Sequence, residues 1–392
     1  MSTDVKTHGL DGSLVEADWP GLEIDEVRAL LTHYPECGEL IEILSVSPRP
    51  FSAASVVATR SGRVFIKRHH QTVRNREGLL EEHRFMAHLL TRGLSVPRVI
   101  ATDSEETAFA RGEWTYEVHE TPPGIDLYED AISWTPFISA NHAHSAGEAL
   151  ARLHLASQGF SAPPRKPRPL VASFSIFAAT NPHVAFESYI AARPALAEDV
   201  NTRRNFARAL ELLSPFHAEL LPLLPALPPL WTHNDLHASN LFWSDRSDAA
   251  RAVAIIDFGL ADRTNAIYDL AHAIERNIVE WLALVRAPEH PESVPVHFDH
   301  LLALLQGYES VRPLSAEEAA ALAPMTALCH AEFALTEADY FLGVLHSEEK
   351  ARVASHDYLV GHARWFRGAG GSKLLDAICA WATARERRTV RA

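Results

Sequence analysis

Residues Trp231–Trp243 read W-T-H-N-D-L-H-A-S-N-L-F-W, and a related signal, A-I-I-D-F-G-L-A, follows at Ala254–Ala261. The first stretch has the pattern H-x-D-x-x-x-x-N, which ends at Asn240, and the second places Asp257 after a β-branched run and before Phe-Gly. Phosphoryl transfer needs one carboxylate near the attacking hydroxyl, and a carboxylate and an amide oxygen that hold Mg²⁺ on the phosphates. Asp235, Asn240 and Asp257 supply these groups, so the two stretches in this order predict phosphoryl-transfer chemistry.

Length and composition set limits on the class of protein. The 392 residues are enough for two domains or one large two-lobed unit. A formal net charge of −14 argues against nucleic acid as the main partner. The chain has no apolar run of about 18 residues that would span a membrane, no signal-peptide pattern at its start, and three cysteines far apart. These features predict a cytoplasmic protein that acts on small molecules, with no membrane and no nucleic-acid partner.

The periodicity of apolar residues changes along the chain and predicts its organisation. Residues 1–36 are expected to form an N-terminal extension that includes a short helix over Ile24–Tyr34. Short strands and one helix over 37–119 predict a small β-rich lobe, residues 120–124 read as a hinge, and 125–392 read as a large helical lobe. The expected strands are 40–46, 55–59, 64–68, 107–111 and 114–119, and the later helices include 269–285, 315–346 and 348–366.

A lysine and a glutamate in the β-rich lobe form a candidate pair. Lys67 lies near the end of the third predicted strand, and the helix predicted over 74–92 carries Glu82 in a mostly apolar stripe. A glutamate in such a stripe needs a cation, and Lys67 is the predicted partner, an arrangement that would fix the lysine against nucleotide phosphates. Glu81 is an alternative partner, and helical register favours Glu82.

Two further segments are candidates for nucleotide contacts. The loop over 47–55 has no glycine, so backbone amides and the hydroxyl of Ser52 or Ser55 are expected to cover the phosphates. At the hinge, exposed groups at His119 and Thr121 are expected to contact the nucleotide base.

These motifs resemble those of the aminoglycoside phosphotransferase and choline kinase-like family, and are nearest to its homoserine kinase and stress-response kinase branch. The resemblance implies a protein-kinase-like, two-lobed α+β fold, with a small antiparallel sheet and one helix in the first lobe and a mainly helical second lobe. The motifs that carry it, in chain order, are Val64–Lys67, Glu82–Leu89 with Val96-Pro97, Ala149–His154, His233–Asn240, Ile256–Gly259 and Tyr268–Ala271.

The resemblance also implies a role for each matched residue, with ATP and Mg²⁺ as cofactors and a site in the cleft between the lobes. Asp235 would accept the proton of the attacking hydroxyl, while Asn240 and Asp257 would bind Mg²⁺. The supporting roles would be phosphate binding by Lys67, orientation of that lysine by Glu82, bracing of the catalytic loop by His233, and a structural helix cap at Asp269.

The acceptor is predicted to be a small hydroxylated molecule that carries an amine, of the amino alcohol, amino acid or aminoglycoside type. The reason is that carboxylates in a partly dry pocket favour a cation. Candidate acceptor residues are Glu275 and Glu332, and Glu337 belongs to the same acidic set.

Other functions stay open from the sequence. One is a protein serine/threonine kinase of the stress-response type, and another is a catalytically silent, kinase-like nucleotide-binding protein. A third is a metal hydrolase, because His233-x-Asp235-x-His237 resembles a ligand cluster, although this function leaves Lys67 and Asp257-Phe-Gly without a purpose.

Overall fold

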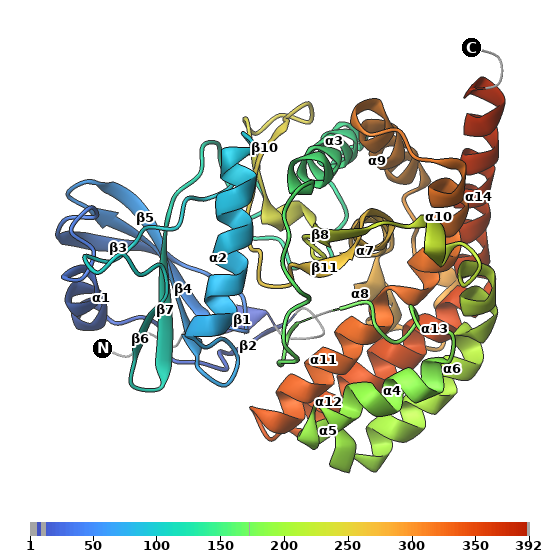
Figure 1. Ribbon diagram of the computed structural model, residues 1–392, viewed down its shortest axis with the longest axis horizontal. Coiled ribbons are helices and arrows are strands. Elements are labelled where there is room, and N and C mark those ends of the chain that lie inside the picture. Colours follow the sequence, from blue (N-terminus) through green and yellow to red (C-terminus); the bar gives the residue numbers. More distant parts are fainter. Residues whose placement is uncertain (1–5, 9–12, 172, 390–392) are drawn as a thin grey trace. The chain divides into compact units, whose positions relative to one another are not determined.

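The computed structural model describes residues 6–8, 13–171 and 173–389, and in it the chain divides into two compact units, residues 1–123 and 124–392 (Figure 1). The boundary falls inside residues 120–124, the stretch that reads as a hinge in the sequence. The first unit is built on an antiparallel sheet and the second is mainly helical, so the fold class is α+β as predicted.

The sheet of the first unit has five strands in the order β3-β4-β5-β7-β6, each antiparallel to its neighbour. Successive side chains of a strand point to opposite faces, so Lys67 and His69 of β5 share one face while Ile66 and Arg68 share the other. The strands are β3 (Leu40–Val46), β4 (Ala53–Thr59), β5 (Gly62–His70), β6 (Phe109–Arg111) and β7 (Trp114–Glu120), and a separate hairpin joins β1 (Lys6–His8) and β2 (Leu14–Glu16).

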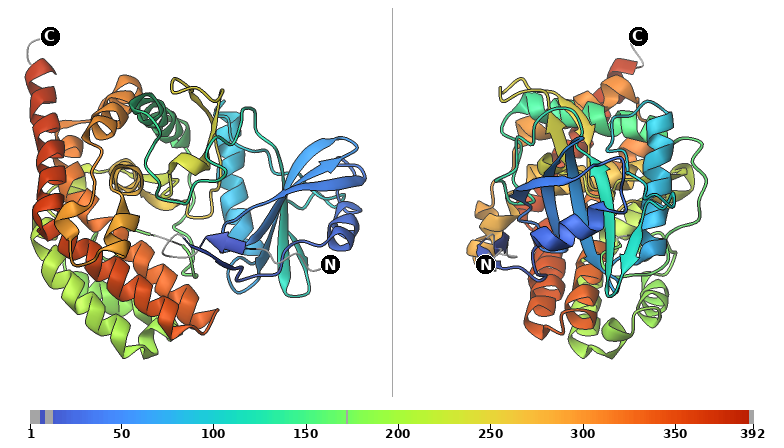
Figure 2. Two further views of the ribbon diagram at one scale, coloured as in Figure 1. Left: turned by 180° about the vertical axis from the view of Figure 1, so that it is seen from behind. Right: turned by 90° about the vertical axis from the view of Figure 1, so that its left-hand side faces the viewer.

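Two helices cover opposite faces of this sheet, as Figure 1 and the right-hand view of Figure 2 show. Helix α1 (Ile24–Leu31) buries Val27, Leu30 and Leu31 in one core with Ile66 and the strands around it. Helix α2 (Arg76–Thr91) begins at Asn75, whose side chain accepts a hydrogen bond from Gly78 N, and covers the face that carries Lys67.

Helix α1 is an integral part of the first unit, which corrects the boundary placed at residue 36. Its Glu26 carboxylate accepts two hydrogen bonds from Arg68 Nη1, at 2.7 and 2.8 Å, and one from the Tyr116 hydroxyl at 2.7 Å. The Arg68 guanidinium also lies 4.2 Å from the centre of the Trp114 ring. This partly buried ion pair and the apolar contacts together hold α1 on the sheet.

The second unit places two short hairpins in its core. Strand β8 (Pro229–Thr232) pairs with β11 (Asp262–Asn265), and β9 (Leu241–Trp243) pairs with β10 (Ala252–Ile255). The second hairpin lies inside the first along the chain, so the β8–β9 and β10–β11 connections lie at adjacent ends of the paired strands. The two motif stretches fall on these connections.

Helices surround the hairpins, and α3 and α9 lie side by side in Figures 1 and 2. Gly147 of α3 and Gly307 of α9 face the backbone of the other helix so closely that a Cβ atom on either would collide with a carbonyl oxygen. The helices are α3 (Ala140–Ser157), α4 (Pro182–Ala191), α5 (Pro194–Glu198), α6 (Val200–Leu220), α7 (Ala266–Ile278), α8 (Trp281–Arg286), α9 (Phe298–Val311), α10 (Ala316–Leu328), α11 (His330–Gly343), α12 (Glu348–Arg352), α13 (Gly361–Arg367) and α14 (Ala369–Thr389).

Three long predicted helices are interrupted in the structure. The helix expected over 269–285 ends at Ile278 and resumes at Trp281, and the one expected over 315–346 changes direction at Cys329. Within 348–366 the segment Val353–Val360 is a π-helix, which joins α12 to α13. Apolar residues continue through each break, because the segments on both sides of it are largely buried, and periodicity alone therefore misses the breaks.

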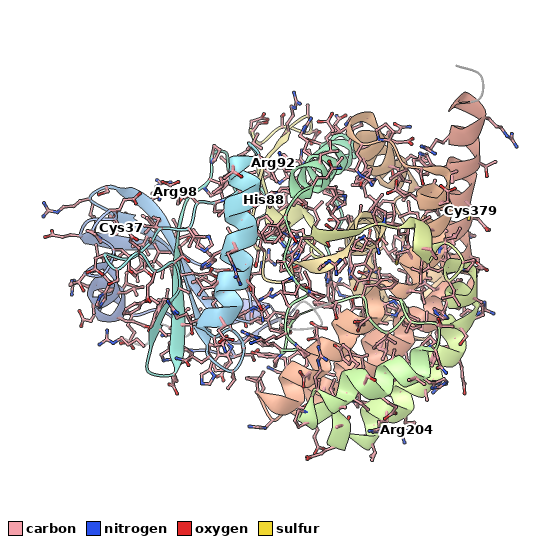
Figure 3. The ribbon with its side chains drawn as sticks, in the orientation of Figure 1. Cys37, His88, Arg92, Arg98, Arg204 and Cys379 are labelled. Carbon is pink, nitrogen blue, oxygen red and sulfur yellow. The ribbon has the colours of Figure 1, made fainter. Side chains whose placement is uncertain are left out.

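The cysteines Cys37, Cys329 and Cys379 are free thiols, and Figure 3 shows Cys379 on α14. Within the described part of the chain, no helix combines the length and the apolar character needed to cross a membrane.

Candidate active site

Two loops of the second unit bring the motif carboxylates into one electrostatic environment. Asp235 lies between β8 and the 3₁₀ turn Ala238–Asn240, and Asp257 lies between β10 and β11. Burial raises the pKa of Asp235 to about 6, against the lowering effect of the Arg276 and His233 charges, and Asp257 contributes to the rise. The nested hairpins thus bring together two carboxylates that are 22 positions apart in the chain.

His233 joins the two loops through its backbone and its ring. Its Nε2–H donates to Ile256 O at 2.9 Å, one residue before Asp257, while its Nδ1 accepts from Asp235 N at 3.2 Å. The ring also contacts Phe258 edge to face. Both ring nitrogens are therefore occupied by backbone groups, which suits the predicted support role and argues against a metal-ligand role for His233.

Helix α7 holds the catalytic loop at both of its ends. The buried Asp269 accepts from His233 N and Asn234 N, each at 2.8 Å, and Asn277 accepts from Ala238 N and donates to Leu236 O. Asn234 has a φ of 62°, a left-handed conformation that these bonds fix. The expectation of a helix cap at Asp269 is therefore wrong, because Asn265 caps α7 by accepting from Ile267 N and Tyr268 N.

The Asp235 carboxylate lies between a cation and an amide. Its Oδ1 lies 2.8 Å from Arg276 Nε, and its Oδ2 accepts from Asn240 Nδ2 at 3.3 Å. The side chain keeps 20% of its surface exposed, whereas Arg276 is fully buried. A carboxylate with a pKa near 6 is mostly ionised at neutral pH and is still basic enough to accept a proton, as a general base requires.

Asn240 and Asp257 carry the kinds of oxygen atom that a Mg²⁺ ion binds. Asn240 Nδ2 also donates to the backbone oxygen of Asp235 at 2.9 Å, which fixes the amide so that Oδ1 is the atom turned away from this bond. Asp257 is exposed, has a φ of 58°, and accepts from Gly259 N at 3.3 Å through Oδ1. An amide oxygen and an ionised carboxylate are the oxygen ligands that Mg²⁺ prefers, so these residues fit the ion.

The predicted acceptor glutamates differ in what they contact. Glu332 accepts from Ser175 N, Ile176 N and the hydroxyls of Ser173 and Ser175, so its carboxylate anchors this segment to α11. Glu275 accepts from His362 Nδ1 at 3.1 Å through Oε1. Glu337 is also buried, and burial raises its pKa to about 8, with Arg276 opposing the rise and Asp235 adding to it.

In the first unit, an arginine lies beside the predicted glutamate. Glu82 lies on the buried side of α2 as predicted, and its Oε1 accepts from Arg74 Nε at 2.9 Å in an ion pair buried on both sides. Lys67 is half-buried and lies directly opposite Glu117 of β7 in the sheet register. A second carboxylate therefore shares the face of the sheet that carries Lys67, and the pairing of Lys67 with Glu82 stays a prediction.

The remaining predicted nucleotide contacts lie in or next to strands β4 and β7 of the first unit. Ser52 precedes β4 in the turn, and Thr121 follows β7 and donates to Arg63 O at 3.3 Å. Ser55 pairs with Ile66, so its buried hydroxyl lies on the α1 side of the sheet and not on the side of Lys67. This placement contradicts a phosphate contact by the Ser55 side chain. His119 directs Nε2 to Glu117 at 2.9 Å.

Sequence reasoning missed Arg276 and Asn277. Arg276 follows Asp269 by seven positions, which is two turns of α7, so the two side chains lie on the same side of the helix. The signal in the sequence is a run of charged and amide side chains within a helix that is otherwise apolar, because such groups are buried only where they have partners.

Comparisons with known proteins agree with this geometry. Residues 51–314 match the model of the phosphotransferase enzyme family. The chain is 29% identical to a homoserine kinase of Xanthobacter autotrophicus over 81% of this chain and 86% of that protein. It is 28% identical to a homoserine kinase of Cupriavidus pinatubonensis, where the alignment spans 60% of this chain and 61% of that protein.

Solved structures of low sequence identity share the fold. An aminopropanol kinase associated with a microcompartment matches with a TM-score of 0.55 at 19% identity, over 89% of this chain and 99% of that one. An amicoumacin kinase, solved with AMP-PNP and Ca²⁺, matches with a TM-score of 0.53 at 14% identity, over 88% of this chain and 94% of that one. The resemblance, the fold class and the broad class of small-molecule phosphotransferase are confirmed. The motif loops, the helix that holds them and the match over residues 51–314 all agree, and the chain belongs to the phosphotransferase enzyme family.

Proposed function

We propose that this protein is an ATP- and Mg²⁺-dependent kinase that phosphorylates the hydroxyl of a small amino acid. The observation that supports an amino acid as the acceptor is the position of the Arg276 guanidinium beside Asp235. Arg276 is fully buried, and its Nη1 and Nη2 have no hydrogen-bond partner among the residues that the structure describes. A buried cation with two unpaired nitrogens is costly in the free protein, and a carboxylate on the acceptor would pair with both.

The surroundings of Arg276 favour a planar, bidentate partner. The guanidinium carbon lies 4.3 Å from the centre of the Phe333 ring and 5.5 Å from that of Trp134, so aromatic rings flank it. Such rings hold the plane of the guanidinium and exclude water, which strengthens a charge-assisted bond. The acceptor carboxylate would therefore be bound next to the base.

Glu337 and Glu275 supply the complementary charge for an amine. Both are buried, and both interact electrostatically with the Arg276 charge. Burial keeps the pKa of Glu337 near 8, so it is largely protonated at neutral pH. An ammonium group nearby would favour its ionised form and would be bound in return. The acceptor is thus still proposed to carry an amine. Glu337 is proposed to bind this amine in place of Glu332, because the Glu332 carboxylate is hydrogen-bonded to residues 173–176.

The catalytic roles follow from the contacts of each residue. Asp235 would accept the proton of the acceptor hydroxyl, while Arg276 and Asn240 hold the carboxylate in place. Asn240 and Asp257 would hold Mg²⁺, which neutralises phosphate charge when bound. Lys67 and the residues around it would bind the nucleotide phosphates.

A set of acceptors that differ by one charged group tests the proposal. ADP release is measured with homoserine, with 3-aminopropanol, which lacks the carboxylate, and with 4-hydroxybutyrate, which lacks the amine. One lost charge-assisted hydrogen bond is worth about 1.5–3 kcal/mol, so we expect each analogue to lower kcat/KM by about 10- to 100-fold.

Variants then connect each loss to its residue. In Arg276→Met the preference for homoserine over 3-aminopropanol should disappear, and in Glu337→Gln the preference over 4-hydroxybutyrate should disappear. Ser214→Ala, a change at an exposed position of α6, is the control and should keep both preferences. Equal kcat/KM for homoserine and 3-aminopropanol in the unmodified protein would refute the carboxylate pocket, and the phosphotransferase class would stand.

A further inference from the structure

A cluster of three imidazoles around one buried carboxylate lies in the first unit and includes His119, one of the predicted nucleotide contacts. The imidazole cluster comprises His69 of β5, His83 of α2, and Glu117 and His119 of β7. Glu117 Oε2 lies 2.8 Å from His83 Nε2 and 2.9 Å from His119 Nε2, and Glu117 Oε1 lies 3.0 Å from His69 Nε2. Three histidines on three separate elements therefore each direct their Nε2 atom at the Glu117 carboxylate.

We propose that His83, Glu117 and His119 form a binding site for a divalent transition metal such as Zn²⁺, with His69 beside it. Their ligand atoms all lie within 4.8 Å of one another. Zn²⁺ binds imidazole nitrogen and carboxylate oxygen at about 2.0–2.2 Å, so a tetrahedral ion places such atoms about 3.3 Å apart. The separations of 2.8 and 2.9 Å are close to this spacing, and a small outward shift of the rings admits the ion.

The donor set and its charge also suit the ion. Two imidazoles and one carboxylate give three protein ligands and leave a fourth position for water, the pattern of an open zinc site. A carboxylate that is ionised and imidazoles that are neutral are the forms that bind metals.

A contact outside the ligand set orients one ring. His83 Nδ1 lies 3.0 Å from the Thr107 hydroxyl, so the ring can change tautomer when Nε2 takes a metal, with Nδ1–H then donating to Thr107 Oγ1. The neutral imidazole keeps one proton in both states, so binding through His83 needs no net loss of a proton. His119 retains 12% of its side-chain surface exposed and gives the ion a route to the otherwise buried group.

An ordinary buried network explains the cluster less well. One cation and one neutral donor satisfy the half-buried carboxylate of Glu26 in the same unit, where the partners are Arg68 and Tyr116. Glu117 instead has three imidazoles, of which two share one oxygen atom. Imidazoles are poor partners for this purpose, because each must lose its own hydration without bringing a fixed charge.

The test measures binding of Zn²⁺ and Co²⁺ to the full chain after treatment with a chelator. We expect one ion per chain by metal analysis, a tetrahedral Co²⁺ absorption band in the visible range, and a higher Tm with metal. His83→Ala and His119→Ala should each weaken binding by more than about 100-fold, and Thr107→Val by about 10-fold. Glu117→Gln keeps the shape of the carboxylate and should also abolish the Co²⁺ band.

Two controls make the result specific. His88→Ala lies on the same helix α2, farther along it (Figure 3), and should bind metal as the unmodified protein does. The other group of possible ligands, His297, Asp299 and His300, is more exposed, and a His297→Ala/His300→Ala variant should also keep the ion. Because His119 is the least buried member, His119→Ala remains informative if Glu117→Gln fails to fold.

Three outcomes would overturn the proposal. They are no Zn²⁺ or Co²⁺ bound to the unmodified protein, binding that survives His83→Ala and His119→Ala, or binding lost only in the His297→Ala/His300→Ala variant. In the first case the imidazole cluster is a hydrogen-bond network alone. None of these outcomes bears on the proposed base and acceptor residues, which lie in the second unit.

Discussion

Replacing Asp269 by asparagine should disable the catalytic loop without removing any group that touches the reactants. Asp269 Oδ1 accepts from Asn234 N and Oδ2 accepts from His233 N, each at 2.8 Å, and Oδ2 also accepts from His154 Nε2 at 3.0 Å. All four residues are buried completely. The substitution keeps the shape of the side chain and replaces one acceptor oxygen by a donor group.

The magnitude follows from these three bonds. The new amide group faces a backbone N–H, whose loss of its acceptor costs about 1–3 kcal/mol. The bonds that remain change from charge-assisted to neutral, at about 1 kcal/mol each. The sum is about 3–5 kcal/mol. Asn234 has a strained left-handed backbone, so the loop can leave its active conformation by releasing this strain. We therefore expect much of the free-energy cost to appear as a smaller population of the active loop conformation.

The assay compares kcat/KM with Tm. A loss of about 3 kcal/mol from the competent loop lowers kcat/KM by about 10²-fold. The matched control is Asn265→Ala, which removes the cap of α7 and costs about 1 kcal/mol of stability without touching the loop. It should lower Tm and leave kcat/KM nearly unchanged. If Asp269→Asn lost no more than about 3-fold in kcat/KM, the carboxylate would not be what holds the loop.

Three further predictions concern single carboxylates of the second unit. Asp235→Asn should lower turnover by about 10²–10⁴-fold with little change in ATP affinity, measured by single-turnover kinetics and nucleotide titration; near-normal turnover would assign the base to another residue. Asp257→Ala should abolish the Mg²⁺-dependent part of the rise in Tm with ATP, and an unchanged rise would exclude it as a metal ligand. The pKa of Glu337 is raised from 4.5 to about 8 in the folded protein, so the folded state binds more protons than the unfolded state between these values. Stability therefore falls as pH rises through this window, at up to about 1.4 kcal/mol per pH unit, and Glu337→Gln should remove that slope in urea unfolding; an identical slope in the variant would contradict the raised pKa.

Helix α7 is the element on which the candidate site depends. Within four turns it contributes Asp269 and Asn277 to the ends of the catalytic loop and Arg276 to the base. Every residue of this helix is buried, so the polar ones persist only because the loop and the acceptor region satisfy them. The position of Asp235 is thereby set by a helix that begins 31 residues later in the chain.

The sequence by itself determined the fold class, the family and the local chemistry of the two motif loops. Asp235, Asn240 and Asp257 are found from the sequence because each motif is short, and its spacing reflects the turn that presents it. The strands around Lys67 are likewise predictable, because alternation of apolar residues is a local property of a half-buried strand.

Only the tertiary structure decided which charged groups meet. Arg74 lies beside Glu82, Asp269 bonds the catalytic loop instead of capping its helix, and Arg276 lies against Asp235. Sequence reveals that a buried charge needs a partner but not which one, because partners are chosen by packing between elements far apart in the chain. The imidazole cluster shows the same limit, since β5, α2 and β7 bring His69, His83 and Glu117 together across 48 positions.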